Sequence, residues 1–288
     1  MFKGSIVALV TPFRNGKVDE KALGELVEFH IEKGTHAILP CGTTGESATL
    51  DHSEHVRTVE VVLEAASGRI QVIAGTGSNS TQEAIYLTGQ AKKMGAAAAL
   101  LVSPYYNKPT QEGLYLHYKT VAEATDIPII LYNVPSRTSK NIEPETVARL
   151  SEIENIVAIK EASGSLDQAS RIASLCDITI LSGDDSLTLP LMSIGATGVV
   201  SVAANIVPER VAEMTEAWLS GDPQKAKEIH YQLFPLFKAL FIETNPIPVK
   251  AALAAMGKIE EEYRLPLCPM SESNRKHLLS VMKDLKLI

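Results

Sequence analysis

The stretch IVAIKEASG at residues 156–164 is an apolar run that ends in a lysine, a glutamate and small residues. An apolar run without alternation is typical of a strand buried on both faces, as in a parallel sheet. Lysine is rarely buried, and burial disfavours the charged ammonium, which makes the neutral amine available as a nucleophile. Lys160 is therefore either a nucleophile at the end of a buried strand or a side chain that extends out to solvent.

The same pattern recurs from residue 4 to about residue 205. Short apolar runs end in small or polar residues, and amphipathic helical segments follow them. Strands that alternate with helices of this length indicate parallel pairing with right-handed crossovers. Eight such units predict an α/β fold, a (β/α)8 TIM barrel, whereas an open dinucleotide-binding sheet would have a Gly-x-Gly-x-x-Gly turn after its first strand. The predicted strands are 6–10, 37–39, 70–74, 98–102, 127–131, 156–159, 178–181 and 198–202, and the predicted helices include 20–33, 53–66, 81–94 and 111–124.

The last part of the chain has a different pattern, without strand-like runs. A helix that starts near residue 208 ends at a Gly-Asp-Pro break at 221–223. Three helical segments follow, which we place at 224–242, 248–256 and 271–287. We therefore expect two domains, a (β/α)8 catalytic barrel at 1–221 and a C-terminal helical domain at 222–288.

The composition is typical of a soluble globular protein, with 45% hydrophobic and 21% charged residues among 288. The net charge of −7 and the lack of a basic run argue against nucleic acid or an anionic membrane surface as a partner. We also expect no membrane span and no signal peptide. Three widely spaced cysteines (Cys41, Cys176 and Cys268) indicate free thiols in a reducing compartment. These features predict a cytoplasmic protein.

The reactive face of such a barrel is formed by the carboxyl ends of the strands and the loops that follow them. Lys160 is the lysine that directly ends a predicted strand. His52 and His55 lie three residues apart without an evident third ligand, so we expect no metal site. Asp184 and Asp185 follow the seventh strand in place of a glycine-rich loop, which argues against a phosphorylated substrate. Nothing in the sequence indicates a nicotinamide or flavin cofactor, and we expect none.

The remaining strand-end residues suit imine chemistry on a small keto acid. A lysine amine condenses with a ketone, and the resulting iminium is an electron sink for an enamine nucleophile. The Gly-Thr-Thr-Gly turn at 42–45 offers N–H groups and hydroxyls to a carboxylate at a helix N-terminus. Tyr132 is placed to carry protons, and Arg137 to bind a second carboxylate. Each residue also has an ordinary structural interpretation, as a helix cap, a packed ring or a solvated charge.

At these residues the sequence resembles the pyruvate-dependent class I aldolase family of (β/α)8 barrels. The resemblance covers essentially the whole chain and rests on long motifs. These motifs are GSIVALVTPF at 4–13, GTTGESATL at 42–50, SPYYNKPTQEGLYLHY at 103–118, YNVPSRT at 132–138, IKEASG at 159–164, LSGDD at 181–185 and NPIPVK at 245–250.

The resemblance implies a lyase that condenses pyruvate with L-aspartate 4-semialdehyde, the first committed step of lysine and diaminopimelate biosynthesis. Lys160 resembles the Schiff-base lysine, and Tyr132 forms a proton relay with Thr43 and Tyr106. The tyrosine at the position of Tyr106 reaches into a neighbouring subunit in this family, which implies a homotetramer built as a dimer of dimers. The implied substrate contacts are Thr44, Arg137, Val200 and Gly183.

The resemblance also implies a second site, at which L-lysine binds as a feedback inhibitor. The ordinary interpretation of the same residues is a polar surface at a subunit interface. The residues that match this pocket are Ser47, Ala48, His52, His55, Asn79, Glu83 and Tyr105.

Two alternative functions stay open at this point. A sister enzyme, such as N-acetylneuraminate lyase or a keto-sugar-acid aldolase, would keep Lys160 and Tyr132. Those relatives usually lack the second hydroxyl of the Thr43–Thr44 pair and the Ser-Arg-Thr segment at 136–138, and both are present here. A non-catalytic barrel that only binds a ligand would be expected to have lost Lys160 or Tyr132.

Overall fold

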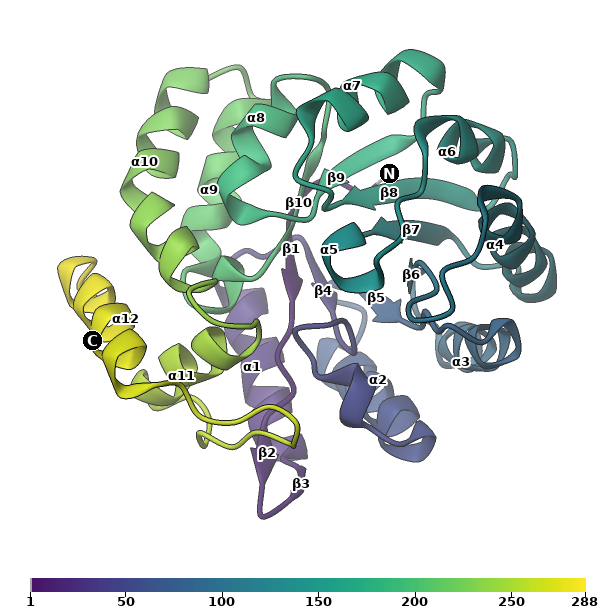
Figure 1. Ribbon diagram of the computed structural model, residues 1–288. Coiled ribbons are helices and arrows are strands. Elements are labelled where there is room, and N and C mark those ends of the chain that lie inside the picture. Colours follow the sequence, from purple (N-terminus) through teal and green to yellow (C-terminus); the bar gives the residue numbers. More distant parts are fainter. Residues whose placement is uncertain (1) are drawn as a thin grey trace.

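The computed structural model describes residues 2–288 and shows a closed barrel of parallel strands inside a ring of helices (Figure 1). Within these residues, eight barrel strands pair in chain order, and the last strand pairs back with the first. The predicted fold class is therefore confirmed. The barrel strands are β1 (Gly4–Ala8), β4 (Ala37–Leu39), β5 (Gln71–Gly75), β6 (Ala98–Val102), β7 (Ile129–Asn133), β8 (Ile156–Glu161), β9 (Thr179–Ser182) and β10 (Gly198–Ser201).

The ends of two strands differ from the prediction in a way that matters for the site. The fifth barrel strand, β7, begins at Ile129 and ends at Asn133, so Tyr132 lies within the strand and not in the loop after it. Pro128 has no N–H to give to a strand ladder, which favours a later start. Strand β8 likewise continues through Lys160 and Glu161, which places both side chains on the paired part of the strand.

Helices cover the outside of the barrel, and short polar side chains begin several of them. Asp51, Ser80, Thr110 and Ser165 each accept a hydrogen bond from a backbone N–H in the first turn of the helix that follows. The helices of the barrel part are α1 (Glu20–Glu32), α2 (His52–Ala66), α3 (Thr81–Met94), α4 (Gln111–Thr125), α5 (Pro135–Thr138), α6 (Pro144–Ser151), α7 (Leu166–Leu175), α8 (Thr188–Met192) and α9 (Pro208–Leu219).

A small hairpin after β1 was not predicted. It consists of β2 (Phe13–Arg14) and β3 (Lys17–Val18), joined by Asn15 and Gly16, which both have positive φ angles (54° and 77°). An Asn-Gly pair with this backbone is a strong hairpin signal. The hairpin holds the side chain of Phe13 fully buried.

Three helices form the C-terminal part of the chain, and no strand occurs among the described residues from 222 onward. They are α10 (Pro223–Ala239), α11 (Ile247–Ala255) and α12 (Glu272–Asp284). Helix α10 packs on α9, and α12 packs on α10 and α11 (Figure 1). The division into two domains near residue 222 stays a prediction.

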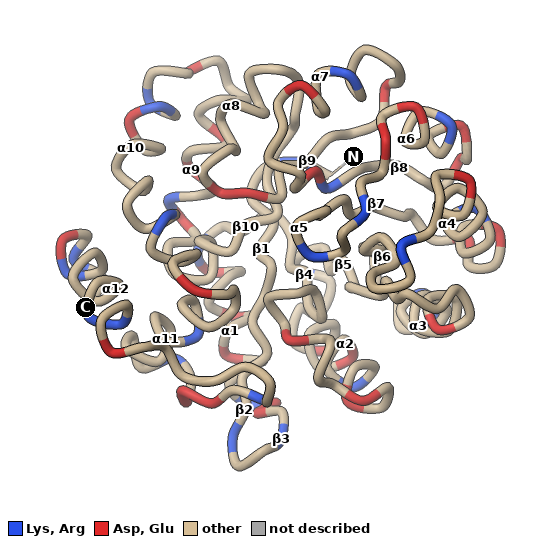
Figure 2. The backbone as a smooth tube through the Cα atoms, in the orientation of Figure 1, with Lys and Arg blue, Asp and Glu red and all other residues tan. Residues whose placement is uncertain are grey.

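The apolar core has two layers. Side chains such as Ile6, Leu39, Ile73 and Val200 fill the inside of the barrel, and a larger cluster lies between the strands and the helices. Both signs of charge are spread around the outer helices (Figure 2). A search of the described residues found no helix with the length and hydropathy of a membrane span.

Candidate active site

Lys160 and Tyr132 are neighbours inside the barrel. They are register partners on the adjacent strands β8 and β7, and each is 6% exposed. The Lys160 ammonium lies 4.0 Å from the centre of the Tyr132 ring. Of the two interpretations of Lys160, the one in which its side chain extends out to solvent is therefore wrong. The pairing of strands places an amine and a phenol, a nucleophile and a proton carrier, side by side in the barrel interior.

Gly183 and Val200 lie beside this pair. Val200 is 1% exposed and packs in the interior cluster that contains Tyr132. A Cβ atom on Gly183 would lie 3.1 Å from Cε of Lys160 and 2.6 Å from Cβ of Ala162. Glycine at this position therefore leaves the room that the lysine side chain occupies.

Thr43 and Thr44 lie on a tight loop after β4. The loop closes with hydrogen bonds from the Gly45 and Glu46 N–H groups to the carbonyls of Gly42 and Thr43. Thr44 is buried, and its Oγ1 accepts a hydrogen bond of 3.1 Å from Nδ2 of Asn245. The expectation of a helix N-terminus at this loop is wrong, because only a three-residue 3₁₀ turn follows before α2 begins at His52.

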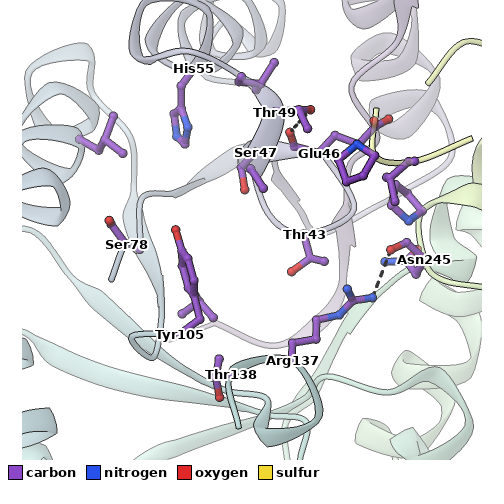
Figure 3. Close-up of a pocket in the computed structure, with 18 of the residues that line it drawn as sticks. Thr43, Glu46, Ser47, Thr49, His55, Ser78, Tyr105, Arg137, Thr138 and Asn245 are labelled. Atoms are coloured by element: carbon purple, nitrogen blue, oxygen red, sulfur yellow. Dashed lines mark hydrogen bonds between the residues drawn. The ribbon is translucent and has the colours of Figure 1, made fainter. Parts of the chain in front are cut away.

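Arg137 lies on the single turn of helix α5 that follows β7. Its Nη2 donates a hydrogen bond of 3.1 Å to the backbone carbonyl of Asn245, drawn as a dashed line in Figure 3. This bond leaves the other guanidinium N–H groups available to a carboxylate.

One pocket of about 380 Å³ connects the region of Thr43 and Arg137 with the predicted lysine site. His55, Ser78 and Tyr105 lie on one side of it, and Thr43, Arg137 and Asn245 lie on the other (Figure 3). Its lining includes six of the seven residues predicted for the lysine site and lacks Asn79, whose carbonyl accepts a hydrogen bond from the Asn107 amide. The six are Ser47, Ala48, His52, His55, Glu83 and Tyr105.

Glu83 and His55 have different electrostatic environments in this pocket. The Glu83 carboxylate accepts hydrogen bonds from the Ser78 hydroxyl and from His52, and these contacts lower its pKa. Burial lowers the pKa of His55, whose Nε2 donates to the carbonyl of Gly75 over 2.7 Å. The pocket thus offers a carboxylate that is charged at neutral pH, beside a neutral imidazole.

Tyr106 is separated from the other predicted catalytic residues. Its side chain is 90% exposed, and its φ angle of 71° lies in the left-handed region. Within one chain Tyr106 extends into solvent, and it does not line the pocket.

Two buried carboxylates at strand ends, Glu161 and Asp185, were not among the predicted site residues. Glu161 accepts hydrogen bonds from the Asn133 amide and the Ser163 N–H, and burial raises its pKa. Asp185 accepts hydrogen bonds from Ser201 Oγ and from two N–H groups after β10, and burial raises its pKa to about 6. The sequence signal that could have identified these two residues is a carboxylate directly after a buried strand. Glu161 thereby links the ends of β7 and β8 beside Lys160, and Asp185 links the ends of β9 and β10 beside Val200.

A search of the described residues found no cluster of three His, Cys, Asp or Glu side chains that could hold a metal ion. The site is a lysine and a tyrosine inside a barrel, with hydroxyls and an arginine at the strand ends. This combination defines the class I, Schiff-base-forming aldolase-type lyases.

Comparison with known proteins places the chain within this class. The family model described as "Dihydrodipicolinate synthetase family" matches residues 1–285. The 4-hydroxy-tetrahydrodipicolinate synthase of Thermodesulfovibrio yellowstonii is 60% identical, with all of both chains covered. The chain belongs to the dihydrodipicolinate synthetase family.

Solved structures agree with this assignment. The crystal structure of dihydrodipicolinate synthase from Aquifex aeolicus superposes with a TM-score of 0.98 at 56% identity and covers 99% of each chain. The enzyme from Cyanidioschyzon merolae, solved with lysine bound, has a TM-score of 0.97 at 44% identity and covers 100% of this chain and 99% of its own.

Proposed function

We propose that the protein condenses pyruvate with L-aspartate 4-semialdehyde, the first committed step toward lysine and diaminopimelate. The observation that carries this proposal is the buried pair of Lys160 and Tyr132 in a chain that is 60% identical to a 4-hydroxy-tetrahydrodipicolinate synthase. The proposal therefore rests both on the family and on a site that retains the groups that imine chemistry requires.

The proposed first half of the reaction takes place at Lys160. Its neutral amine attacks the ketone carbon of pyruvate, and loss of water gives an iminium. Loss of a methyl proton then gives an enamine, with Tyr132 as the group that carries protons to and from the reacting atoms. Thr44 binds the pyruvate carboxylate, and Gly183 and Val200 shape the space around the methyl group.

The proposed second half joins the two substrates. The enamine carbon attacks the aldehyde carbon of the semialdehyde, whose carboxylate is held by Arg137. The amino group of the semialdehyde then attacks the iminium carbon, which closes the ring and releases the Lys160 amine. Thr43 and Tyr106 complete the proton relay with Tyr132 in this proposal.

Borohydride trapping tests the mechanism directly. Reduction in the presence of pyruvate, followed by peptide mass mapping, is expected to give an adduct on Lys160. An active protein with unmodified Lys160 would overturn the proposal. Turnover with L-aspartate 4-semialdehyde but not with N-acetylmannosamine then separates this reaction from that of an N-acetylneuraminate lyase.

Regulation by L-lysine is also proposed. The Glu83 carboxylate would bind an ammonium group, and the hydroxyl of Ser47 and the phenol of Tyr105 line the same pocket. The relative from Cyanidioschyzon merolae was solved with lysine bound.

We also propose that the protein forms a homotetramer and that it is cytoplasmic. The side chain of Tyr106, exposed in a single chain, would be covered by a partner subunit and would enter that subunit's site. Sedimentation analysis tests this part, and a monomer with full activity would contradict it.

A further inference from the structure

We propose that residues 245–250, at the start of α11, position the substrate-binding loop at 42–46 through two side-chain contacts. In one contact, Asn245 orients the hydroxyl of Thr44. In the other, Lys250 forms a buried ion pair with Glu46. This inference rests on the proposed function, because it assumes that Thr44 binds the carboxylate of pyruvate.

The contact of Asn245 with Thr44 has a defined direction. Asn245 Nδ2 donates to Thr44 Oγ1 over 3.1 Å, and both residues are at most 5% exposed. Because the Thr44 oxygen accepts this bond, its own hydrogen is free to be donated to a substrate carboxylate. The backbone carbonyl of Asn245 accepts from Arg137, so the same residue contacts the groups proposed to bind both substrates.

Lys250 and Glu46 form an ion pair away from water. The Lys250 ammonium lies 2.5 Å from the Glu46 carboxylate, and both side chains have 0% exposure. The ammonium also lies 4.3 Å from the centre of the Phe13 ring and 5.4 Å from that of Tyr263. Burial lowers the pKa of Lys250 against the attraction of Glu46.

A buried ion pair is weak evidence for stability, since the loss of hydration offsets much of the attraction. Its geometric effect is clearer, because two such charges must meet at one place. Glu46, two residues after Thr44, has a φ angle of 52°, a conformation unusual for a residue with a side chain. The ion pair therefore fixes the end of the loop that carries Thr43 and Thr44.

The other hydrogen bonds of the loop backbone are mostly within the loop itself. From outside the loop, the Thr11 hydroxyl donates to the Gly45 carbonyl over 2.7 Å, and the Arg264 N–H donates to the Glu46 carboxylate over 3.4 Å. The contacts from Asn245 and Lys250 come from residues 201 and 204 positions further along the chain. The C-terminal part of the chain is thus built into the substrate site.

Replacement of Asn245 tests the first contact. Asn245→Ala is expected to raise the pyruvate KM about tenfold, because the hydrogen bond from the Thr44 hydroxyl to the substrate carboxylate loses its orientation. A tenfold change corresponds to the loss of about one hydrogen bond to a charged group. The KM for the semialdehyde and kcat should change little, because the bond to Arg137 uses the backbone. Asn245→Asp should raise the pyruvate KM at least as much, since its carboxylate accepts the Thr44 hydrogen.

Two control experiments distinguish an effect of Asn245 on the position of Thr44 from a general effect on the fold. Asn274→Ala removes another C-terminal amide, which contacts Glu243, and should leave the pyruvate KM unchanged. In a Thr44→Val background, Asn245→Ala should have no further effect on the pyruvate KM. An unchanged pyruvate KM in both Asn245 variants, or an undiminished effect without the Thr44 hydroxyl, would overturn the inference.

The ion pair is tested with a matched double variant. Lys250→Met alone leaves a buried carboxylate unpaired and should lower the melting temperature strongly. Adding Glu46→Gln should restore the melting temperature but leave the pyruvate KM raised. If the double variant recovers both the melting temperature and the pyruvate KM, the pair has only a structural role.

Borohydride trapping distinguishes failure of this inference from failure of the proposed function. The wild type and the Asn245 variants should all form the Lys160 adduct at saturating pyruvate, with half-maximal trapping at about tenfold higher pyruvate in the variants. No adduct in any protein would reject the proposed function. Equal pyruvate dependence in all of them would reject only the positioning role.

Discussion

Tyr132 and Lys160 are register partners on adjacent strands, and the ammonium of Lys160 lies 4.0 Å from the centre of the Tyr132 ring. The face of an aromatic ring attracts a cation, so the same contact favours the positively charged iminium that would form on Lys160. The phenol oxygen and the ring thus have separate tasks, one in proton transfer and the other in packing against the nitrogen.

Tyr132→Phe separates these two tasks. The ring and its packing against Lys160 stay, so we expect an unchanged melting temperature, together with a fall in kcat of roughly 10²–10⁴-fold from the lost proton carrier. The matched control is Tyr118→Phe, because the Tyr118 hydroxyl is buried against the Leu101 carbonyl. This control should lose about 1 kcal/mol of unfolding free energy without a change in kcat. Equal kcat values for Tyr132→Phe and the wild type would rule out the relay.

Mixed subunits test whether Tyr106 acts in a neighbouring chain. Tyr106→Ala and Lys160→Ala should each be nearly inactive as pure proteins. When the two are refolded together, some sites combine an intact Lys160 with an intact Tyr106 of the partner, and activity should return. If the mixture remains as inactive as its components although mixed oligomers form, Tyr106 does not act across the interface.

Two variants, His55→Ala and Glu83→Gln, test the proposed L-lysine site. Calorimetric titration with L-lysine should show binding in the wild type, weaker binding in His55→Ala and little binding in Glu83→Gln, which removes the charge that would face the ligand ammonium. Both variants should keep the pyruvate KM of the wild type. No heat and no inhibition with L-lysine in the wild type would reject feedback control.

His30 gives a prediction for acid stability. It is fully buried, its Nδ1 lies 3.0 Å from Thr35 Oγ1, and burial lowers its pKa from 6.5 to about 3. The unfolded chain therefore takes up a proton as the pH falls below about 6.5, whereas the folded chain does not until about pH 3. The contribution of His30 to the free energy of unfolding is fully present above pH 6.5. It decreases by up to about 1.4 kcal/mol per pH unit as the pH falls toward the folded-state pKa.

His30→Asn keeps a polar partner for Thr35 and removes this titration. Denaturant unfolding between pH 7 and pH 4 should show a smaller decrease in the free energy of unfolding for the variant. The exposed His277 is the control for the exchange of a histidine for an asparagine. An identical pH dependence in His30→Asn and the wild type would show that His30 is not responsible.

The barrel and the position of Lys160 could be predicted because the signals are local. Each strand is a short apolar run of its own, and the carboxyl ends of parallel strands meet on one face. That Tyr132 and Lys160 lie on neighbouring strands followed from the order of the strands alone. The hairpin at Asn15 and Gly16 also had a local signal, which was missed.

The contacts of Asn245 and Lys250 could not be predicted in the same way. Each joins residues about 200 positions apart, and no periodicity of the sequence specifies such a pair. A lysine within the otherwise apolar segment IPVKAALAA of α11 did indicate burial, but not its partner.

The ion pair between Glu46 and Lys250 also has a consequence for synthesis on the ribosome. Lys250 is made 204 residues after Glu46, which at bacterial or eukaryotic speeds is a delay of roughly 10 to 40 s. By the end of that interval every barrel strand has been made, and until then the loop at 42–46 lacks its partner. A nascent chain can therefore complete all of its barrel strands before the C-terminal part of the chain can hold the loop that carries Thr43 and Thr44 in place.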